Sequence, residues 1–193
     1  MGRIIISENA SLDAVVQDPT GEEGFERGGW FTQVTEADRN AWSAAAETEA
    51  RDAAALLFGR RSYEFFAARW PERTGPLADR LNRLPKYVVS TTLTDPAWAP
   101  TTVLGADTGA AIAALRRETA GDIIVYASFH LVSLLLEHDL VDELRLTIYP
   151  VLLGTGTRLP ARPGSTQLHR TRVVPLGENL VQLTYRRHPE TRP

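Results

Sequence analysis

Three short segments carry the residues whose types and spacing could do chemistry. Residues 59–62 read Gly-Arg-Arg-Ser, residues 90–92 read Ser-Thr-Thr, and residues 127–128 read Ala-Ser. Each follows an apolar run that predicts a buried strand, and two of them precede a predicted helix. A helix N-terminus presents N–H groups and a partial positive charge that suit phosphate. The segments therefore predict a phosphate-bearing ligand at one sheet edge, where open α/β sheets bind ligands.

Arginine and serine in the first of these segments allow two interpretations. The Arg60 guanidinium is a fork-shaped donor that matches phosphate oxygens. Alternatively, Gly59 only forms a tight turn, Ser62 and Ser128 only cap helices, and Arg60 and Arg61 are solvated. The sequence contains neither the G-x-G-x-x-G pattern nor the G-x-x-x-x-G-K-[ST] pattern of nucleotide-binding loops.

The elements that must position these segments alternate between strands and helices. Strands are predicted at residues 3–7, 53–58, 86–90, 101–104, 122–126, 143–149, 166–174 and 180–187. Helices are predicted at residues 35–50, 62–70, 107–117 and 128–138, with a helical turn near 77–82. Thr35 and Asp38 have the spacing of a capping box, and residues 8–34 form a long loop.

This order predicts an α/β fold with a mixed, mainly parallel sheet and a C-terminal antiparallel hairpin around residues 177–179. The length of 193 residues suits a single domain, residues 1–193.

Composition excludes several classes of function. The chain has no cysteine, which excludes thiol catalysis and disulfides. Its formal net charge of −3, with both signs interspersed, predicts no nucleic-acid partner. No apolar run is long enough for a membrane helix, and we expect a cytoplasmic protein. His130, in the first turn of its helix, is expected to be structural or solvent-facing. The spacing of His138, His169 and His188 matches no metal site.

Several segments match one family. Residues 59–64, Gly-Arg-Arg-Ser-Tyr-Glu, resemble the G-R-x-T-[YW]-E segment of the dihydrofolate-reductase-like superfamily, which includes the RibD C-terminal reductase domain of riboflavin biosynthesis. Residues 11–14 resemble its S-L-D-G, and residues 86–93 resemble K-Y-V-V-S-R-T-L. The longest match has two parts. Residues 140–146 resemble the family's L-V-D-E-L-x-L, and residues 149–156 contain its P-V-L-L-G-x-G.

The resemblance implies helices on both faces of the sheet, NADPH binding (with NADH possible) and hydride transfer to a C=N or C=O bond. The resemblance also implies that residues of the three turns contact the cofactor, namely Gly59, Arg60, Arg61, Ser62, Ser90, Thr91, Ala127 and Ser128. Ser90 and Thr91 would lie at the adenosine 2′-phosphate. Three positions depart from the family pattern, because Ala14 and Ala127 replace glycine and Thr91 replaces arginine.

The substrate is expected to be a small, cyclic or heteroaromatic molecule. The helix position where dihydrofolate reductases hold their carboxylate falls near Ser43, which argues against dihydrofolate, although Glu47 lies one turn on. Asp13 is the candidate catalytic proton donor, or alternatively a turn-forming residue. Trp30 and Phe31 are candidates to cover the substrate pocket, or alternatively pin the long loop.

The sequence thus leads to an NADPH-dependent reductase. A degenerate, non-catalytic family member that binds a ligand or dimerises is the alternative. A third hypothesis is a structural interaction module, which rests only on the C-terminal hairpin, whose exposed edge could pair across a two-fold axis. A homodimer is expected whichever hypothesis holds.

Overall fold

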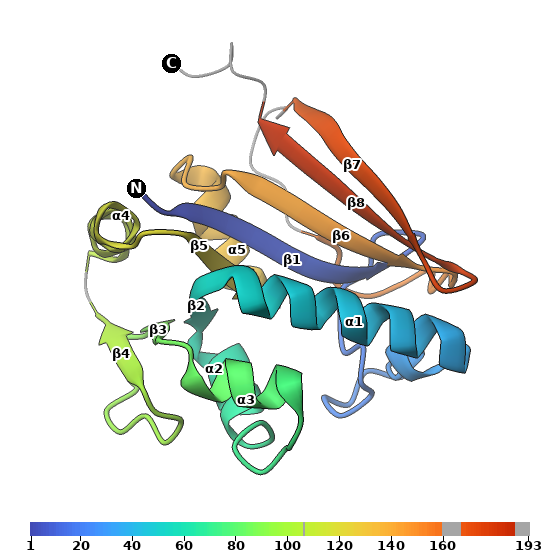
Figure 1. Ribbon diagram of the computed structural model, residues 1–193, viewed down its shortest axis with the longest axis horizontal. Coiled ribbons are helices and arrows are strands. Elements are labelled where there is room, and N and C mark those ends of the chain that lie inside the picture. Colours follow the sequence, from blue (N-terminus) through green and yellow to red (C-terminus); the bar gives the residue numbers. More distant parts are fainter. Residues whose placement is uncertain (106, 160–166, 188–193) are drawn as a thin grey trace. The chain divides into compact units, whose positions relative to one another are not determined.

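A computed structural model describes residues 1–105, 107–159 and 167–187, and Figure 1 shows its helices and strands. In this part of the chain, eight strands form a mixed sheet in the order β4-β3-β2-β5-β1-β6-β8-β7. The sheet is mostly parallel, with antiparallel β6-β8-β7 pairing near the C-terminus, as the alternation of elements predicted. The chain divides into two compact units, and β1 (Arg3–Ser11) and α1 (Glu36–Asp52) contribute residues to both.

The first unit contains residues 1–6 and 46–142. Its parallel strands are β2 (Ala53–Gly59), β3 (Lys86–Val89), β4 (Thr101–Leu104) and β5 (Asp122–Tyr126). Its helices are α2 (Arg60–Ala67), α3 (Pro76–Arg83), α4 (Thr108–Glu118) and α5 (Phe129–Glu137).

Apolar strands fill the core of this unit. Leu56, Phe58, Val88 and Ile124 are fully buried and pack with residues of α2 and α3. A Cβ on Gly59 would lie 3.8 Å from Leu131 of α5, so α5 packs near the end of β2. Strands of a parallel sheet are covered on both faces and therefore read as continuous hydrophobic runs. Burial of one such side chain stabilises the fold by about 1.5–3 kcal/mol.

The second unit contains residues 7–45 and the chain from Glu143 onward. Its antiparallel strands are β6 (Glu143–Tyr149), β7 (Leu168–Leu176) and β8 (Leu180–Arg187), and a short 3-10 helix, η1, spans Trp30–Thr32. The core of this unit joins buried Trp30, Tyr149, Leu176 and Leu180 to Trp42 of α1. One face of the β6-β8-β7 sheet is therefore packed against α1.

The start of α1 is tied to the turn between β7 and β8. Thr35 and Asp38 exchange hydrogen bonds of 3.2 Å, which confirms the predicted capping box. The Asp38 carboxylate also accepts the backbone N–H groups of Glu178 and Asn179, at 2.7 and 2.9 Å, and the Asn179 amide at 2.9 Å. These donors hold the pKa of Asp38 well below its usual range, so the carboxylate is ionised and clamps the turn.

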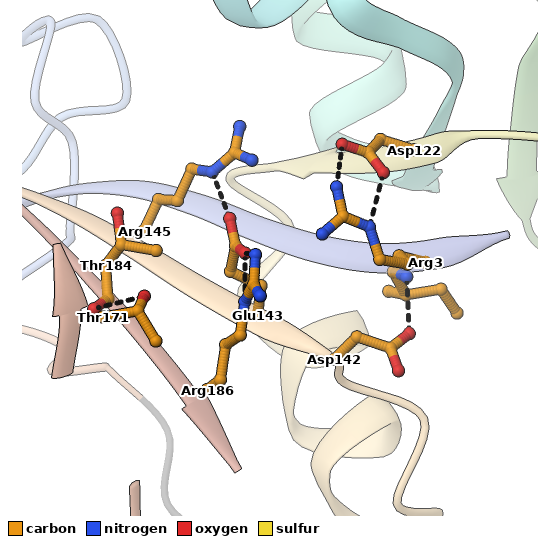
Figure 2. A network of polar contacts seen from close by, with 9 residues as sticks. Arg3, Asp122, Asp142, Glu143, Arg145, Thr171, Thr184 and Arg186 are labelled. Carbon is orange, nitrogen blue, oxygen red and sulfur yellow. Dashed lines mark hydrogen bonds and ion pairs between the residues drawn. The ribbon is translucent and has the colours of Figure 1, made fainter. Parts of the chain in front are cut away.

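Each unit contains ion pairs and hydrogen bonds between polar side chains, and Figure 2 shows several of them. In the first unit, Arg3 makes two hydrogen bonds to Asp122, of 2.9 and 2.8 Å, and Asp142 accepts the backbone N–H of Ile4 at 2.9 Å. In the second unit, buried Glu143 lies between Arg145 and Arg186, at 2.6 and 2.8 Å. The two guanidinium groups lower the pKa of Glu143 against the opposing effect of burial.

Several predicted boundaries were wrong by a few residues. Strand β1 continues to Ser11, so the long loop begins at Leu12 rather than at Glu8. Helix α2 begins at Arg60 and ends at Ala67, whereas the sequence predicted 62–70. Strand β7 ends at Leu176, and the predicted start at Thr166 lies outside the described residues. The polar residues of β1 indicated a loop in the sequence. In the structure β1 lies between two other strands, and this pairing outweighs the low strand propensity of its polar side chains.

Candidate functional site

Three strand ends of the first unit lie side by side. Strand β2 pairs with both β3 and β5 in parallel, with Gly59 opposite Val89 and Leu56 opposite Ile124. Parallel pairing brings the carboxyl ends of neighbouring strands to the same edge, so the turns after β2, β3 and β5 are neighbours. The sequence predicted this juxtaposition, and helices α2 and α5 begin directly after two of these turns.

Ser128 connects two of the three turns. Its hydroxyl accepts the Gly59 N–H at 3.1 Å and donates to the carbonyl oxygen of Tyr126 at 3.1 Å. The residue occupies the N-cap position of α5, but its side chain makes no capping hydrogen bond. The predicted capping role of the Ser128 hydroxyl is therefore wrong, because this hydroxyl accepts the Gly59 N–H at the end of the neighbouring strand β2 instead. The first N–H groups of a helix have no intrahelical acceptor and remain available to an anion.

Ala127 and Ala14 replace glycines of the family pattern, and both adopt glycine-like backbone conformations. Their φ angles are +51° and +64°, in the left-handed region that L residues rarely occupy. Such a conformation costs an alanine about 1 kcal/mol or more. The backbone at Ala127 thus has a conformation typical of glycine, and the alanine adds only an exposed methyl group.

Arg60, Arg61 and Ser62 all lie in the first turn of α2. Gly59 is the N-cap, so the predicted capping by Ser62 is wrong, and Ser62 is the third helical residue. Arg60 is half-exposed and pairs with Glu64 one turn on, at 2.9 Å. An exposed pair of this kind contributes little stability, so the guanidinium can exchange Glu64 for an anionic ligand at small cost.

Ser90 and Thr91 follow β3. The Ser90 hydroxyl accepts the backbone N–H groups of Thr92 and Leu93, at 3.1 and 2.9 Å, and shapes a local turn. Thr91 is exposed on this turn. Binding of a 2′-phosphate by these two residues stays a prediction.

Asp13, the predicted proton donor, is held by hydrogen bonds within the second unit. Its carboxylate accepts the N–H groups of Leu153 and Gly154, at 3.1 and 2.8 Å, and the Ser11 hydroxyl at 2.7 Å. These donors, with the Leu153 N–H contributing most, lower the pKa of Asp13 to about 2. A carboxylate that stays ionised at neutral pH favours the alternative, structural role of Asp13.

Trp30 and Phe31, the predicted pocket cover, both belong to the core of the second unit. Trp30 is buried against Tyr149, with ring centroids 5.3 Å apart, and its indole N–H donates to the Gln17 carbonyl. Phe31 packs edge-on against Trp42 at 4.8 Å. These contacts favour the alternative in which the aromatic pair pins the long loop. Glu47, the other candidate substrate residue, is partly exposed on α1.

Glu8 is a candidate that the sequence reasoning missed, since it was placed at the start of a loop. It lies within β1, beside Asn9, whose side chain accepts the Trp42 indole N–H at 3.0 Å on the α1 side. Alternation along a strand directs Glu8 to the opposite face. Its carboxyl makes no hydrogen bond or ion pair with any described residue, and burial raises its pKa to about 8. The available signal was a carboxylate in the polar Ser7-Glu8-Asn9 segment that follows three isoleucines.

An aromatic group next to the β5 turn was also missed. Tyr126, the last residue of β5, stacks on Phe66 of α2 with an interplanar angle of 9° and centroids 6.2 Å apart. Phe66 in turn stacks on Trp70. All three side chains keep partial exposure, so they offer apolar surface beside the turn.

Within residues 1–105, 107–159 and 167–187, no group of three or more His, Asp or Glu side chains is arranged to hold a metal ion. His130 and His138 are exposed, and His188 lies outside the described residues. None of the described helices is both long and apolar enough to cross a membrane.

The fold is similar to a putative riboflavin biosynthesis protein from Shewanella sp. PV-4, with a TM-score of 0.74, 21% identity, and coverage of 96% of this chain and 99% of that one. It is also similar to Enterococcus faecalis dihydrofolate reductase complexed with NADP(H), with a TM-score of 0.64, 14% identity and 96% coverage of each chain.

Acinetobacter baumannii RibD gives a TM-score of 0.66 at 15% identity, over 97% of this chain and 58% of that protein. No curated protein matches the sequence. The model of the RibD C-terminal domain family matches residues 3–182. This chain, with its dihydrofolate-reductase-like fold, belongs to the RibD C-terminal domain family, a family of NAD(P)H reductases.

Proposed function

We propose that this protein is an NADPH-dependent reductase that delivers a hydride to a C=N or C=O bond of a small, cyclic or heteroaromatic substrate other than dihydrofolate. The observation that carries the proposal is the arrangement of three adjacent turns after β2, β3 and β5, two of them tied by the Gly59–Ser128 hydrogen bond. Membership of a reductase family supports the same reading.

The turns of the first unit have the groups that a dinucleotide needs. The N-termini of α2 and α5 would hold phosphate oxygens, with Arg60 adding a charged donor. Ser90 and Thr91 would lie at the 2′-phosphate. When bound, the nicotinamide supplies the hydride, and the protein supplies binding and orientation. The glycine-like backbone of Ala127 removes one argument for the alternative, a degenerate family member without cofactor.

Reduction also requires a proton at the substrate nitrogen or oxygen. Glu8 carries a carboxyl group that is protonated at neutral pH, because its pKa is raised to about 8. Asp13 is ionised under the same conditions. Of these two groups only Glu8 is protonated at neutral pH, and Asp13 holds residues 153–154 by accepting their N–H groups.

Cofactor titration tests the proposal. NADPH should quench tryptophan emission through energy transfer, with a Kd in the micromolar range. Arg60→Ala should weaken NADPH by about 10-fold to 100-fold, since a hydrogen bond to a charged group contributes about 1.5–3 kcal/mol. If Arg60 contacts the 2′-phosphate, NADH should be affected much less. Arg51→Ala is the matched control, because Arg51 is an exposed arginine at the end of α1.

A second variant tests the 2′-phosphate position by gain of function. Thr91→Arg restores the arginine of the family pattern on an exposed turn and should increase the preference for NADPH over NADH. No binding of either cofactor at 1 mM would refute the reductase proposal and favour the degenerate alternative. An unchanged preference in Thr91→Arg would refute only the assignment of the 2′-phosphate to this turn.

A further inference from the structure

Lys86, the first residue of β3, is buried in the first unit, and the sequence contains no other lysine. The residue is 1% exposed, and lysines are almost never buried to this extent unless they are paired. Among the described residues no carboxylate pairs with its ammonium group. Other groups must therefore stabilise the buried charge.

Backbone carbonyl groups of two segments surround the Lys86 ammonium. Its Nζ donates to the carbonyl oxygens of Asn82 and Leu84 at the end of α3, at 2.8 and 2.9 Å, and to that of Ala99 at 3.3 Å. An ammonium has three N–H donors, so these three acceptors satisfy it. The dipole of α3 also favours a cation at this end of the helix. Lys86 thus joins α3 to residues 98–100, which precede β4 (Figure 1).

The indole ring of Trp98 completes the environment of the ammonium. Nζ of Lys86 lies 4.3 Å from the ring centroid, within the range of a cation–π interaction. Trp98 is buried, and its indole N–H donates to Oδ1 of Asn82 at 2.7 Å. Burial lowers the pKa of Lys86 to about 8, so the side chain is still mainly an ammonium at neutral pH. Lys86 therefore holds Trp98 beside α3 as a cation.

Trp98 in turn contacts α2, the helix whose first turn carries Arg60. The backbone N–H of Trp98 donates to the Tyr63 hydroxyl at 2.8 Å, and its ring lies 6.4 Å from the ring of Phe66 at an interplanar angle of 28°. Tyr63 is the buried residue of α2, and the other residues of this helix keep partial or full exposure. The hydrogen bond from Trp98 to Tyr63 therefore helps to set the position of the first turn of α2.

A role confined to capping α3 would explain only some of these contacts. The carbonyl groups of Asn82 and Leu84 belong to the end of α3, whereas Ala99 belongs to the segment that reaches α2. Arg83 shows what a purely local cation does at this helix end. It is exposed, and its Nε donates to the Asp79 carbonyl within α3. Arg83 is therefore the matched control for Lys86.

We propose that Lys86 is a positioning residue for the proposed cofactor site. Its ammonium holds residues 98–100 on α3, and Trp98 transmits this constraint to Tyr63 of α2. A fixed first turn keeps Arg60 and the free N–H groups of α2 in place before a ligand binds, and such preorganisation raises affinity. The effect on the cofactor rests on the proposed function, whereas the link from Lys86 to α2 does not.

NADPH titration of the full chain tests the effect on the site. Lys86→Met keeps an unbranched apolar side chain but removes the charge and its donors, so it should raise the Kd for NADPH by about 10-fold. Lys86→Arg keeps a cation with several donors and should restore most of the affinity. Arg83→Met should bind NADPH as the wild type does. Equal affinities of Lys86→Met and Arg83→Met would overturn the proposal.

A double-mutant cycle tests the route through Trp98. Tyr63→Phe removes the hydroxyl that accepts the Trp98 N–H. If Lys86 acts through this hydrogen bond, the variant with both Lys86→Met and Tyr63→Phe should bind NADPH no more weakly than the weaker-binding single variant. Additive losses in the double variant would overturn this route.

Hydrogen exchange without cofactor separates this proposal from the proposed function. In Lys86→Met the amides of residues 60–67 and 98–101 should exchange about 10-fold faster than in the wild type, and Arg83→Met should leave them unchanged. If this pattern is found but no protein binds NADPH, the reductase function is refuted and the link to α2 stands. Unchanged exchange of residues 60–67 in Lys86→Met would overturn the link, whether or not NADPH binds.

Two measurements keep the test decisive if Lys86→Met does not fold. Tyr63→Phe alone should then raise the exchange of residues 60–67, and no rise would overturn the proposal. Nuclear magnetic resonance of wild-type protein labelled with 15N-lysine gives one side-chain signal, which needs no assignment. The signal should persist at neutral pH, because hydrogen bonds slow its proton exchange, and should titrate at about pH 8. Proton exchange as fast as that of an exposed lysine would overturn the proposal.

Discussion

Glu8 and Asp13 lie five residues apart in the same unit, and their environments shift their pKa values in opposite directions. Asp13 accepts two backbone N–H groups and a hydroxyl, which stabilise its charged form and lower its pKa to about 2. Glu8 lacks such donors among the described residues, and burial raises its pKa to about 8. At neutral pH the first group is ionised and the second carries a proton that it can donate. Carboxyl groups of similar chemistry therefore differ in charge at neutral pH because of their surroundings.

The free energy of unfolding should depend on the titration of Glu8, and no substrate is needed to measure it. The pKa of Glu8 is about 8 in the folded state, against an ordinary value of 4.5, so the folded state binds more protons between these two pH values. The favourable contribution is complete below about pH 4.5 and is lost as pH rises through about 8. Glu8→Gln should remove this loss, so the free energies of unfolding measured in urea at pH 6 and pH 9 should differ less in the variant than in the wild type. An equal difference in both proteins would show that Glu8 has an ordinary pKa.

At the scale of elements, hydrogen bonds between distant segments decide how strands and helices are joined. Ser128 joins the end of β2 to the start of α5, and Asp38 joins the start of α1 to the β7–β8 turn. Gly177 makes the second junction possible. It has a φ of +63°, and a Cβ at this position would lie 2.5 Å from the Asp38 carboxylate.

Gly177→Ala should therefore destabilise the protein by about 1–3 kcal/mol, through backbone strain and displacement of Asp38. For a chain of this length that is a fall in melting temperature of about 2–4 °C per kcal/mol, measurable by calorimetry. Gly24→Ala is the control, since Gly24 has a φ of +83° but no neighbour within 4 Å of the added Cβ. Equal losses in the two variants would show that the Asp38 junction contributes nothing beyond backbone strain.

At the scale of the whole molecule, the strands have a different role in each unit. The carboxyl ends of β2, β3 and β5 form the candidate cofactor edge in the first unit. The antiparallel strands of the second unit pack against α1 on one face.

The sequence by itself determined the order of strands and helices, the parallel turns and the capping box of Thr35 and Asp38. These features depend on local periodicity and on neighbours within a few residues, which a single chain displays directly. The family motifs at residues 59–64 and 140–156 added the fold and the reductase class.

Only the tertiary structure decided the chemistry of individual residues. Asp13 meets its N–H donors 140 residues away, Trp30 is buried against Tyr149, and Ser128 turns to Gly59 instead of capping its own helix. Glu8 differs from other glutamates by the solvent and donors that surround it, not by its place in the sequence. Solvation and long-range hydrogen bonds depend on which segments approach, and that is fixed only when the whole chain has folded.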